Sequence, residues 1–360
     1  MAFTAICVGV TPSGRRWLAI TVQPLRRPFV ILAGVLVILF LALYPIAKSG
    51  WLGPGSDRDD ALNVALAALL AGSYPYHALT YLGNPPTPMP GALLLALPFY
   101  VIGNSALQNL FWMPIFVRFC RTWFINREVA LFFSIMFVLA CPGVLQDYVT
   151  GGDYAINCIY VAIAIDLVAR RCDRDWSRWQ IFLAYGFLAV ALSSRPIFIV
   201  SLPVIAAWLL QRTGLRAAVE FAVYEVLALL LINGPFYFHD PASFPAFNLS
   251  GKLADLPQSF YPGLLVPALC IAIASLSFFT WLNRCQIFGM ISAGFVPMFY
   301  PLYTYQLIMH GPDPSVLPGA GYSVPLAIFG GLWATGFLID PKRGPATATT
   351  SGQPKLRSVS

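Results

Sequence analysis

Charged residues are scarce in this sequence. Asp, Glu, Lys and Arg together make up 10% of the 360 residues, whereas hydrophobic residues make up 58%. Soluble domains carry about 25% charged residues. A chain with so few charges cannot hide its apolar surface in a water-soluble core, so we expect the lipid bilayer to be its solvent.

Metal-ligand patterns are missing as well. The seven cysteines form no CxxC pair, and the sequence contains only three histidines. These absences exclude the usual zinc-site spacings, and most of the cysteines are expected to be small buried hydrophobic residues. The sequence also lacks an internal repeat of the kind that two-halved transporters show.

The apolar runs lack the short alternation of barrel strands and continue for about 20 residues, which is typical of membrane-spanning helices. Every backbone polar group must be paired inside the bilayer, so an all-α, polytopic transmembrane helix bundle is predicted. We expect about ten spans, at residues 28–47, 91–120, 128–146, 154–170, 179–194, 196–211, 217–236, 263–283, 286–306 and 320–339. The run 91–120 is long for one span, and Gly103-Asn104-Ser105 is its predicted weak point.

The placement of basic residues predicts the orientation of the bundle. Most of the 22 Lys and Arg residues fall in segments that would then be cytoplasmic, together with both chain ends. We expect a cytoplasmic segment at 1–27, a transmembrane domain at 28–340 and a disordered tail at 341–360. All three histidines and most acidic residues would lie outside, together with four basic residues: Lys48, Arg58, Arg195 and Lys252.

The first outer segment, 48–90, contains the most polar stretch of the chain, Gly55-Ser56-Asp57-Arg58-Asp59-Asp60. The following residues 61–72 predict a helix of about 18 Å, too short to cross the bilayer, that lies at its interface. Asp57 or Asp59 could cap this helix, and Gly72 could end it. One cap accounts for one or two acids, so three acids and an arginine also indicate a site.

Aromatic residues and prolines follow this helix. Tyr74, Tyr76 and His77 precede the segment 81–90, whose prolines predict an extended polyproline conformation. The aromatic rings would either anchor the chain at the membrane interface or form a platform for a sugar.

Two later outer elements are also rich in polar residues. The segment 145–157 holds Asp147, Asp153 and Asn157, more polar groups than a connecting turn needs, although Asp153 could simply cap a helix. Arg195 lies between two short apolar arms. An arginine at membrane depth either reaches the surface or binds an anion such as a lipid phosphate.

The order of these elements resembles the GT-C superfamily of polyprenyl-phosphate-sugar-dependent glycosyltransferases, and most closely the glycosyltransferase 87 type. The resemblance covers roughly residues 30–215. It is carried by the acidic cluster and by Gly72, Pro75-Tyr76, Tyr81 with Pro85-Pro86, Leu97-Pro98, Gly152 to Asn157 and Ser194-Arg195-Pro196. Asp153 stands where the family usually has Gln, and Arg195 where it often has Lys, so the sugar and the acceptor stay open.

The resemblance implies transfer of a hexose, mannose-like, from a polyprenyl phosphate to an envelope glycan or lipid by an inverting single displacement at the outer face of the cell membrane. One of Asp57, Asp59 and Asp60 would be the base; Asp59 is preferred, with Asp57 or Asp60 in support, and the sequence leaves the choice open. The donor phosphate would bind Arg58, Arg195 and Lys48. Substrate contacts would come from Tyr74, Tyr76, His77, Asn84, Asp153 and Asn157. His239 lies beyond the resemblance and is added because the outer loop 237–262 is long and aromatic-rich enough to cover a site. We expect no cofactor other than a divalent cation held by the carboxylates, and no nucleic-acid partner.

Two other classes of membrane protein compete with this interpretation. A transporter or lipid flippase would need a polar pathway through the spans, for which the sequence offers Asp166, Glu225 and Asn233. A polymerase or ligase of surface polysaccharide would usually have its large outer loop late in the chain, whereas the longest outer segment here is early.

Overall fold

The computed structural model describes residues 27–49, 51, 56–173, 176–245, 261–311 and 324–338. These residues form helices and contain no strand, which confirms the all-α prediction for the described part of the chain. The longer helices are α3 (Arg27–Lys48), α4 (Arg58–Leu70), α5 (Pro90–Val101), α6 (Gln108–Trp123), α7 (Arg127–Leu139), α8 (Pro142–Val149), α9 (Tyr154–Ala169), α10 (Arg178–Leu192), α11 (Ser201–Thr213), α12 (Leu215–His239), α14 (Pro262–Ser275), α15 (Arg284–His310) and α16 (Gly331–Leu338).

Several of these helices are apolar enough to cross a membrane. By length and composition, α3 and the continuous helical stretch Pro196–Thr213 qualify, and two bent helix pairs would raise the number in the described residues to four. Only 22% of the apolar window of α3 is buried, so most of this helix presents hydrocarbon outward. The predicted segments 1–27, apart from Arg27, and 341–360 lie outside the described residues.

The predicted weak point in 91–120 is a sharp break. Helix α5 and the helical stretch Ser105–Trp123 are bent by 99° relative to each other. Gly103 has a φ of +137°, and the Asn104 side chain accepts a hydrogen bond from the Ala106 amide at the start of the second arm. The break therefore follows from local residue chemistry.

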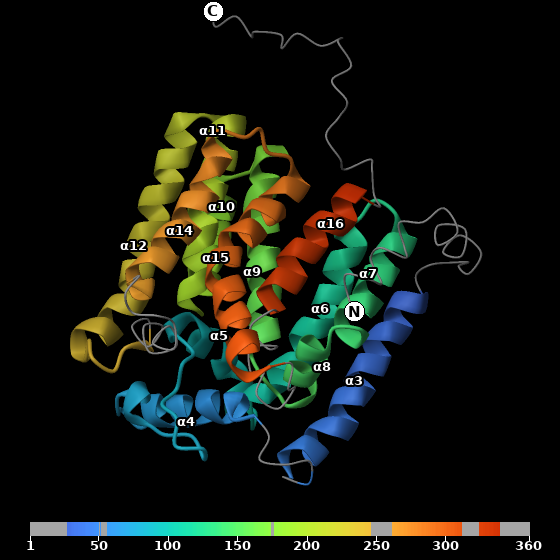
Figure 1. The fold of residues 1–360 in the computed structure, drawn as a ribbon, viewed down its shortest axis with the longest axis vertical. Coiled ribbons are helices and arrows are strands. Elements are labelled where there is room, and N and C mark those ends of the chain that lie inside the picture. Colours follow the sequence, from blue (N-terminus) through green and yellow to red (C-terminus); the bar gives the residue numbers. More distant parts are fainter. Residues whose placement is uncertain are drawn as a thin grey trace, which may run out of the picture.

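The predicted span 128–146 contains a bend that was not expected, because α7 ends at Leu139 and α8 leaves it at an angle of 69°. By composition the two helices together still qualify as one broken span or a re-entrant loop. Pro142 opens α8 and has no amide hydrogen with which to continue the preceding helix. This bend directs α8 to the end of the bundle where α4 lies (Figure 1).

Helix α4 confirms the predicted short helix and starts slightly earlier than expected. It lies across one end of the bundle, roughly perpendicular to the neighbouring long helices (Figure 1). Gly72, with a φ of +75°, ends it as predicted. Residues 84–89, here called the strap, contain no helix and lead into α5 at Pro90. The foot of the bundle is the end formed by α4, the strap and the start of α9.

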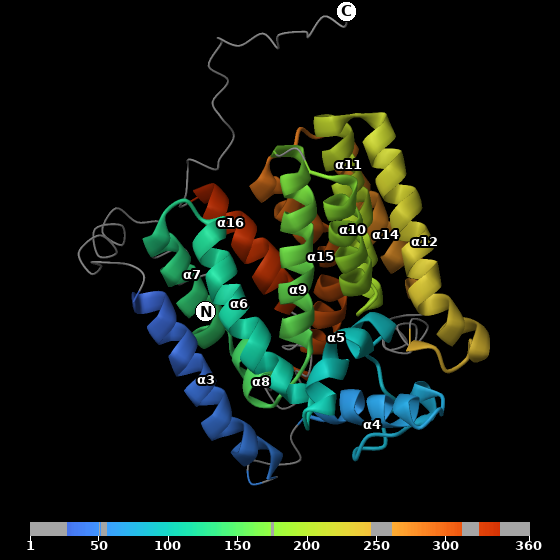
Figure 2. The same ribbon diagram turned by 180° about the vertical axis from the view of Figure 1, so that it is seen from behind.

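Helix α9 is the central element of the main core. Nearly all of its residues are buried, and it lies between α6 on one side and α10 on the other (Figure 2). At the end far from the foot, its Asp166 binds Arg170 at 2.7 Å, which confirms the predicted pair, and also Arg284 from α15. Of the six described cysteines, five are buried, as predicted.

The strap and α5 meet the end of α10 at very close range. The Met89 amide donates to the Ser194 carbonyl at 3.1 Å, and the Gly91 amide donates to the Ser193 carbonyl at 3.2 Å. A Cβ atom on Gly91 would lie 2.0 Å from the Val190 carbonyl oxygen. Only glycine fits this contact, which fixes the position of the residues that follow α10.

We expect Gly91→Ala to lower the thermal stability of the purified protein in detergent, because a backbone atom must move to make room for the methyl group. Overpacking of this kind typically costs about 1–3 kcal/mol. Gly34→Ala is the matched control, since a Cβ there has no neighbour within 4 Å. Equal melting temperatures for the two variants would contradict the close contact.

Candidate functional site

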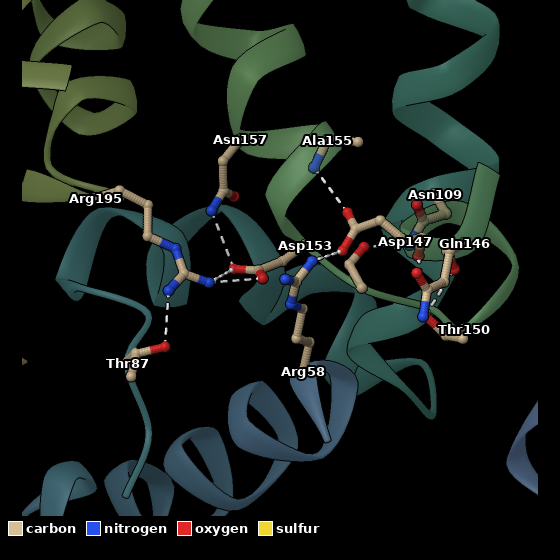
Figure 3. Close-up of polar contacts among 11 residues, drawn as sticks. Arg58, Thr87, Asn109, Gln146, Asp147, Thr150, Asp153, Ala155, Asn157 and Arg195 are labelled. Carbon is tan, nitrogen blue, oxygen red and sulfur yellow. Dashed lines mark hydrogen bonds and ion pairs between the residues drawn. The ribbon is translucent and has the colours of Figure 1, made fainter. Parts of the chain in front are cut away.

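Polar side chains from four separate parts of the chain converge at the foot of the bundle. Arg58 comes from the first turn of α4, Asp147 from α8, Asp153 from the start of α9, and Arg195 from the residues after α10 (Figure 3). Two arginine–aspartate pairs result, and both carboxylates are almost completely buried. Arg58 and Arg195 are called the arginine pair below.

Arg195 binds Asp153 tightly. Its Nη2 atom lies 2.7 Å from each oxygen of the carboxylate, and its Nη1 donates to Thr87 Oγ1 of the strap at 2.8 Å. Asn157 Nδ2 donates to Asp153 Oδ2 at 3.0 Å. Asp153 therefore holds Arg195, and the possibility that its side chain caps α9 is wrong, since it makes no capping hydrogen bond.

The charge of Arg195 is maintained by this pair. Burial by itself would lower the pKa of the guanidinium, but the Asp153 carboxylate raises it above its ordinary value. The site therefore keeps a positive charge in a largely water-free position, with 12% of the Arg195 side chain exposed.

Arg58 forms the second pair with Asp147, a partner that sequence reasoning did not assign. The other carboxylate oxygen of Asp147 accepts a hydrogen bond from the Ala155 amide at 2.7 Å. A Cβ atom on Gly152 would lie 2.2 Å from Asp147 Oδ1. The Gly151-Gly152 sequence was the available signal, because it permits this close approach.

A single aromatic ring lies near both guanidinium groups. The centroid of the Tyr154 ring is 5.5 Å from Cζ of Arg58 and 5.8 Å from Cζ of Arg195, within cation–π range. The two arginines and the two aspartates sum to zero net charge. An anionic ligand of the arginine pair must therefore enter a site whose charges are already balanced.

Two buried donors near this site have no hydrogen-bond partner among the described residues: Arg195 Nε and the Tyr76 hydroxyl. Burial raises the pKa of Tyr76, and the positive charge of Arg195 partly opposes that rise. The two groups therefore interact electrostatically. A buried donor without an acceptor costs about 1–3 kcal/mol. Both groups can therefore donate hydrogen bonds to oxygen atoms of a ligand.

The acidic cluster at the start of α4 holds the neighbouring loop. Asp57 accepts hydrogen bonds from Thr80 Oγ1 at 2.7 Å and Asn84 Nδ2 at 2.8 Å, and Asp60 accepts one from the Tyr81 amide at 2.9 Å. Asp57 is at the N-cap position but makes no capping hydrogen bond, so its predicted capping role is wrong. Asp57 and Asp60 both remain partly exposed.

Asp59, the residue expected to be the base, is the most buried of the three acids, with 3% exposure. Its carboxylate binds Lys48 and accepts a hydrogen bond from the Tyr44 hydroxyl at 2.8 Å. Lys48 therefore binds Asp59. Among the described residues it makes no contact with the arginine pair. The Lys48–Asp59 contact joins α3 to α4.

The predicted aromatic residues form a second group where the segment after α4 meets the end of α12. The Tyr74 ring stacks on His239 with centroids 4.7 Å apart, and the Tyr74 hydroxyl donates to the Phe236 carbonyl at 3.0 Å. His77 Nε2 lies 2.8 Å from Asp240 Oδ2. Two of the three histidines thus lie together, and the side chain of His310 lies outside the described residues.

A cation site is not found in the described residues. No group of three or more His, Cys, Asp or Glu side chains there is arranged to hold a metal ion. Asp57 and Asp60 bind the 80–84 loop, Asp59 binds Lys48 and Asp153 binds Arg195, so the carboxylates that could have shared a cation point to different partners.

A large apolar cavity lies among α7, α15 and α16, and its lining extends to Leu282 and Gln286 near the end of the bundle opposite the foot. Its volume is about 1010 Å³, and α7, α8, α15 and α16 provide most of its lining. Pro142 at one end of α8 lines the cavity, whereas Asp147 further along the same helix binds Arg58. The cavity and the arginine pair are therefore linked through one short helix.

Comparison with known proteins gives no relative that could assign a role to these residues. No family model, no curated protein and no solved structure matches the chain. The resemblance to GT-C glycosyltransferases accordingly stays a prediction, and the function must be argued from the geometry of the foot.

We expect the contact between His77 and Asp240 to weaken in strong acid. The hydrogen bond from His77, followed by those from Ser243, lowers the pKa of Asp240 to about 2. A carboxyl with a lowered pKa stabilises the fold above its ordinary pKa and loses that contribution as the pH falls towards 2. Pepsin cleavage between residues 73 and 84, measured from pH 4.5 to pH 2, should rise in the wild type towards the level of Asp240→Asn.

At pH 4.5 the Asp240→Asn variant should be cleaved faster than the wild type. Pepsin activity itself changes with pH, so the two proteins are compared at each pH value. A difference that persists unchanged at pH 2 would show that ionisation of Asp240 does not hold this segment.

Proposed function

We propose that the protein is an integral membrane glycosyltransferase. It would transfer a hexose from a polyprenyl-phosphate sugar to a hydroxyl group of an envelope glycan or lipid at the foot of the bundle. The observation that carries the proposal is the arginine pair, two cations held at the end of an apolar helix bundle. One of them has a buried donor for which the described residues offer no partner.

The arginine pair suits a phosphate leaving group. Guanidinium groups bind phosphate oxygens through paired N–H donors, and charges fixed in a water-poor site stabilise negative charge as it develops. Arg58 and Arg195 are both held by other residues, so they need not reorganise when the bond to the sugar breaks. The apolar cavity lined by α7, α15 and α16, which reaches the site's helix α8 at Pro142, offers space for the hydrocarbon part of such a donor.

The reaction is a single displacement. The acceptor oxygen forms a bond to sugar C1 while the bond from C1 to the phosphate oxygen breaks, and the phosphate leaves with the electron pair. The acceptor proton passes to a carboxylate of the α4 cluster. Asp57 and Asp60 are partly exposed and can reach an acceptor, whereas Asp59 is buried on Lys48 and is better suited to position α4.

The proposed topology has about ten spans, with both chain ends in the cytoplasm of a multi-pass cell-membrane protein. Arg170, Arg171 and Arg284 lie at the end of the bundle opposite to the foot, as the positive-inside rule requires if the foot faces outward.

The arginine pair is tested by sugar transfer from a panel of polyprenyl-phosphate sugars to envelope acceptors, with purified protein. Arg195→Met should lower kcat by about 100-fold, the usual loss for one group that stabilises a developing anion. Arg216→Met, at an exposed position at the start of α12, is the control and should leave transfer unchanged. Substrate uptake into proteoliposomes without covalent transfer would instead favour a transporter.

The α4 carboxylates are tested one at a time. Asp57→Asn or Asp60→Asn should lower kcat by about 10²–10⁴-fold if that residue is the general base. Asp59→Asn should mainly lower thermal stability, because it removes the partner of Lys48. Full activity in all three variants would rule out a base in this cluster.

A further inference from the structure

We infer that Asp153 occupies, on Arg195, the place that the phosphate of the donor takes, and that binding exchanges one anion for the other. This inference rests on the proposed function and deepens it. Asp153 would be a positioning residue that keeps Arg195 charged and correctly placed until a phosphate monoester or diester arrives.

The contacts of Arg195 show an incomplete binding edge. A guanidinium binds phosphate side-on through two parallel N–H groups, and Nε and Nη2 form one such edge. Here both oxygens of Asp153 lie on Nη2, while Nε is buried and has no partner among the described residues. A phosphate that used both donors would have to take Nη2 from Asp153 (Figure 3).

Charge balance also favours an exchange. The arginine pair is already neutralised by Asp147 and Asp153. An added phosphate would leave the buried site with excess negative charge, which is costly where water is excluded. If Asp153 turns from Arg195 towards water, its charge leaves the buried site. The phosphate then replaces that charge on the guanidinium, and no buried cation stays unpaired.

Asp153 is the more easily displaced of the two carboxylates. Asp147 is held by the backbone amide of Ala155 and packs directly against Gly152. Among the described residues, the Asp153 carboxylate is held, apart from Arg195, by the side-chain amide of Asn157. The side chain of Asn157 can rotate together with the Asp153 carboxylate. The Ala155 amide that holds Asp147 is fixed in the backbone of α9.

The experiment measures binding of farnesyl phosphate to purified protein by calorimetry, with no acceptor present. Removing one negative charge at hydrogen-bond distance from the phosphate site should tighten binding by about tenfold in Asp153→Asn. Thr87→Val removes a neutral partner of Arg195 and should not tighten it, and Arg195→Met should abolish it. Inorganic phosphate, titrated in parallel, distinguishes a lipid headgroup site from one for free phosphate.

Equal or weaker binding by a folded Asp153→Asn variant would overturn the inference, as would the absence of binding by all variants. A second measurement needs no substitution. Asp153 is almost completely buried, so farnesyl phosphate should increase its modification by a water-soluble carbodiimide in the wild-type protein, detected by mass spectrometry. Unchanged modification, despite measurable binding, would also overturn it.

The proposed function and this inference can fail separately. Tighter binding by Asp153→Asn, without sugar transfer by the wild type, would support the anion exchange and refute the glycosyltransferase. Sugar transfer by the wild type, with weaker binding by Asp153→Asn, would support the glycosyltransferase and show that Asp153 contacts the substrate directly.

Discussion

The pairing of buried charges governs how this bundle is put together. Helix α9 is buried along nearly its whole length, and it carries a carboxylate at each end, Asp153 and Asp166. Each carboxylate needs a cation, and each binds one from a residue far away in the sequence, Arg195 at one end and Arg284 at the other; Asp166 binds the nearby Arg170 as well. Removing one member of such a pair leaves an uncompensated charge in the core, so both ends of α9 fix the positions of their neighbours.

The local features of the fold were predictable because single residues cause them. Gly103 and Asn104 break the long run 91–120, Gly72 ends α4, and the proline-rich strap contains no helix. The bend before α8 was missed because periodicity alone treats Pro142 as one more residue of an apolar run, although its missing amide ends the hydrogen-bond pattern of the helix.

The candidate site was predictable as a collection of residues but not as a set of contacts. Composition and the placement of basic residues indicate that Arg58, Asp153 and Arg195 belong to one face. They do not indicate that Arg58 binds Asp147 or that His77 meets Asp240, since these partners are far apart in the sequence and meet only through tertiary packing. For the same reason, position in the sequence could not show that Asp59 is buried whereas Asp57 and Asp60 stay accessible.

The hydrogen bonds from Met89 and Gly91 to the end of α10 set the order in which the protein can be completed during synthesis. When the strap leaves the ribosome, the residues that receive it, Ser193 and Ser194, have not yet been made. The foot of the bundle therefore cannot close until about a hundred further residues have been synthesised and α10 is in place. Until then, the amides of Met89 and Gly91 lack the carbonyl acceptors that hold them in the completed fold.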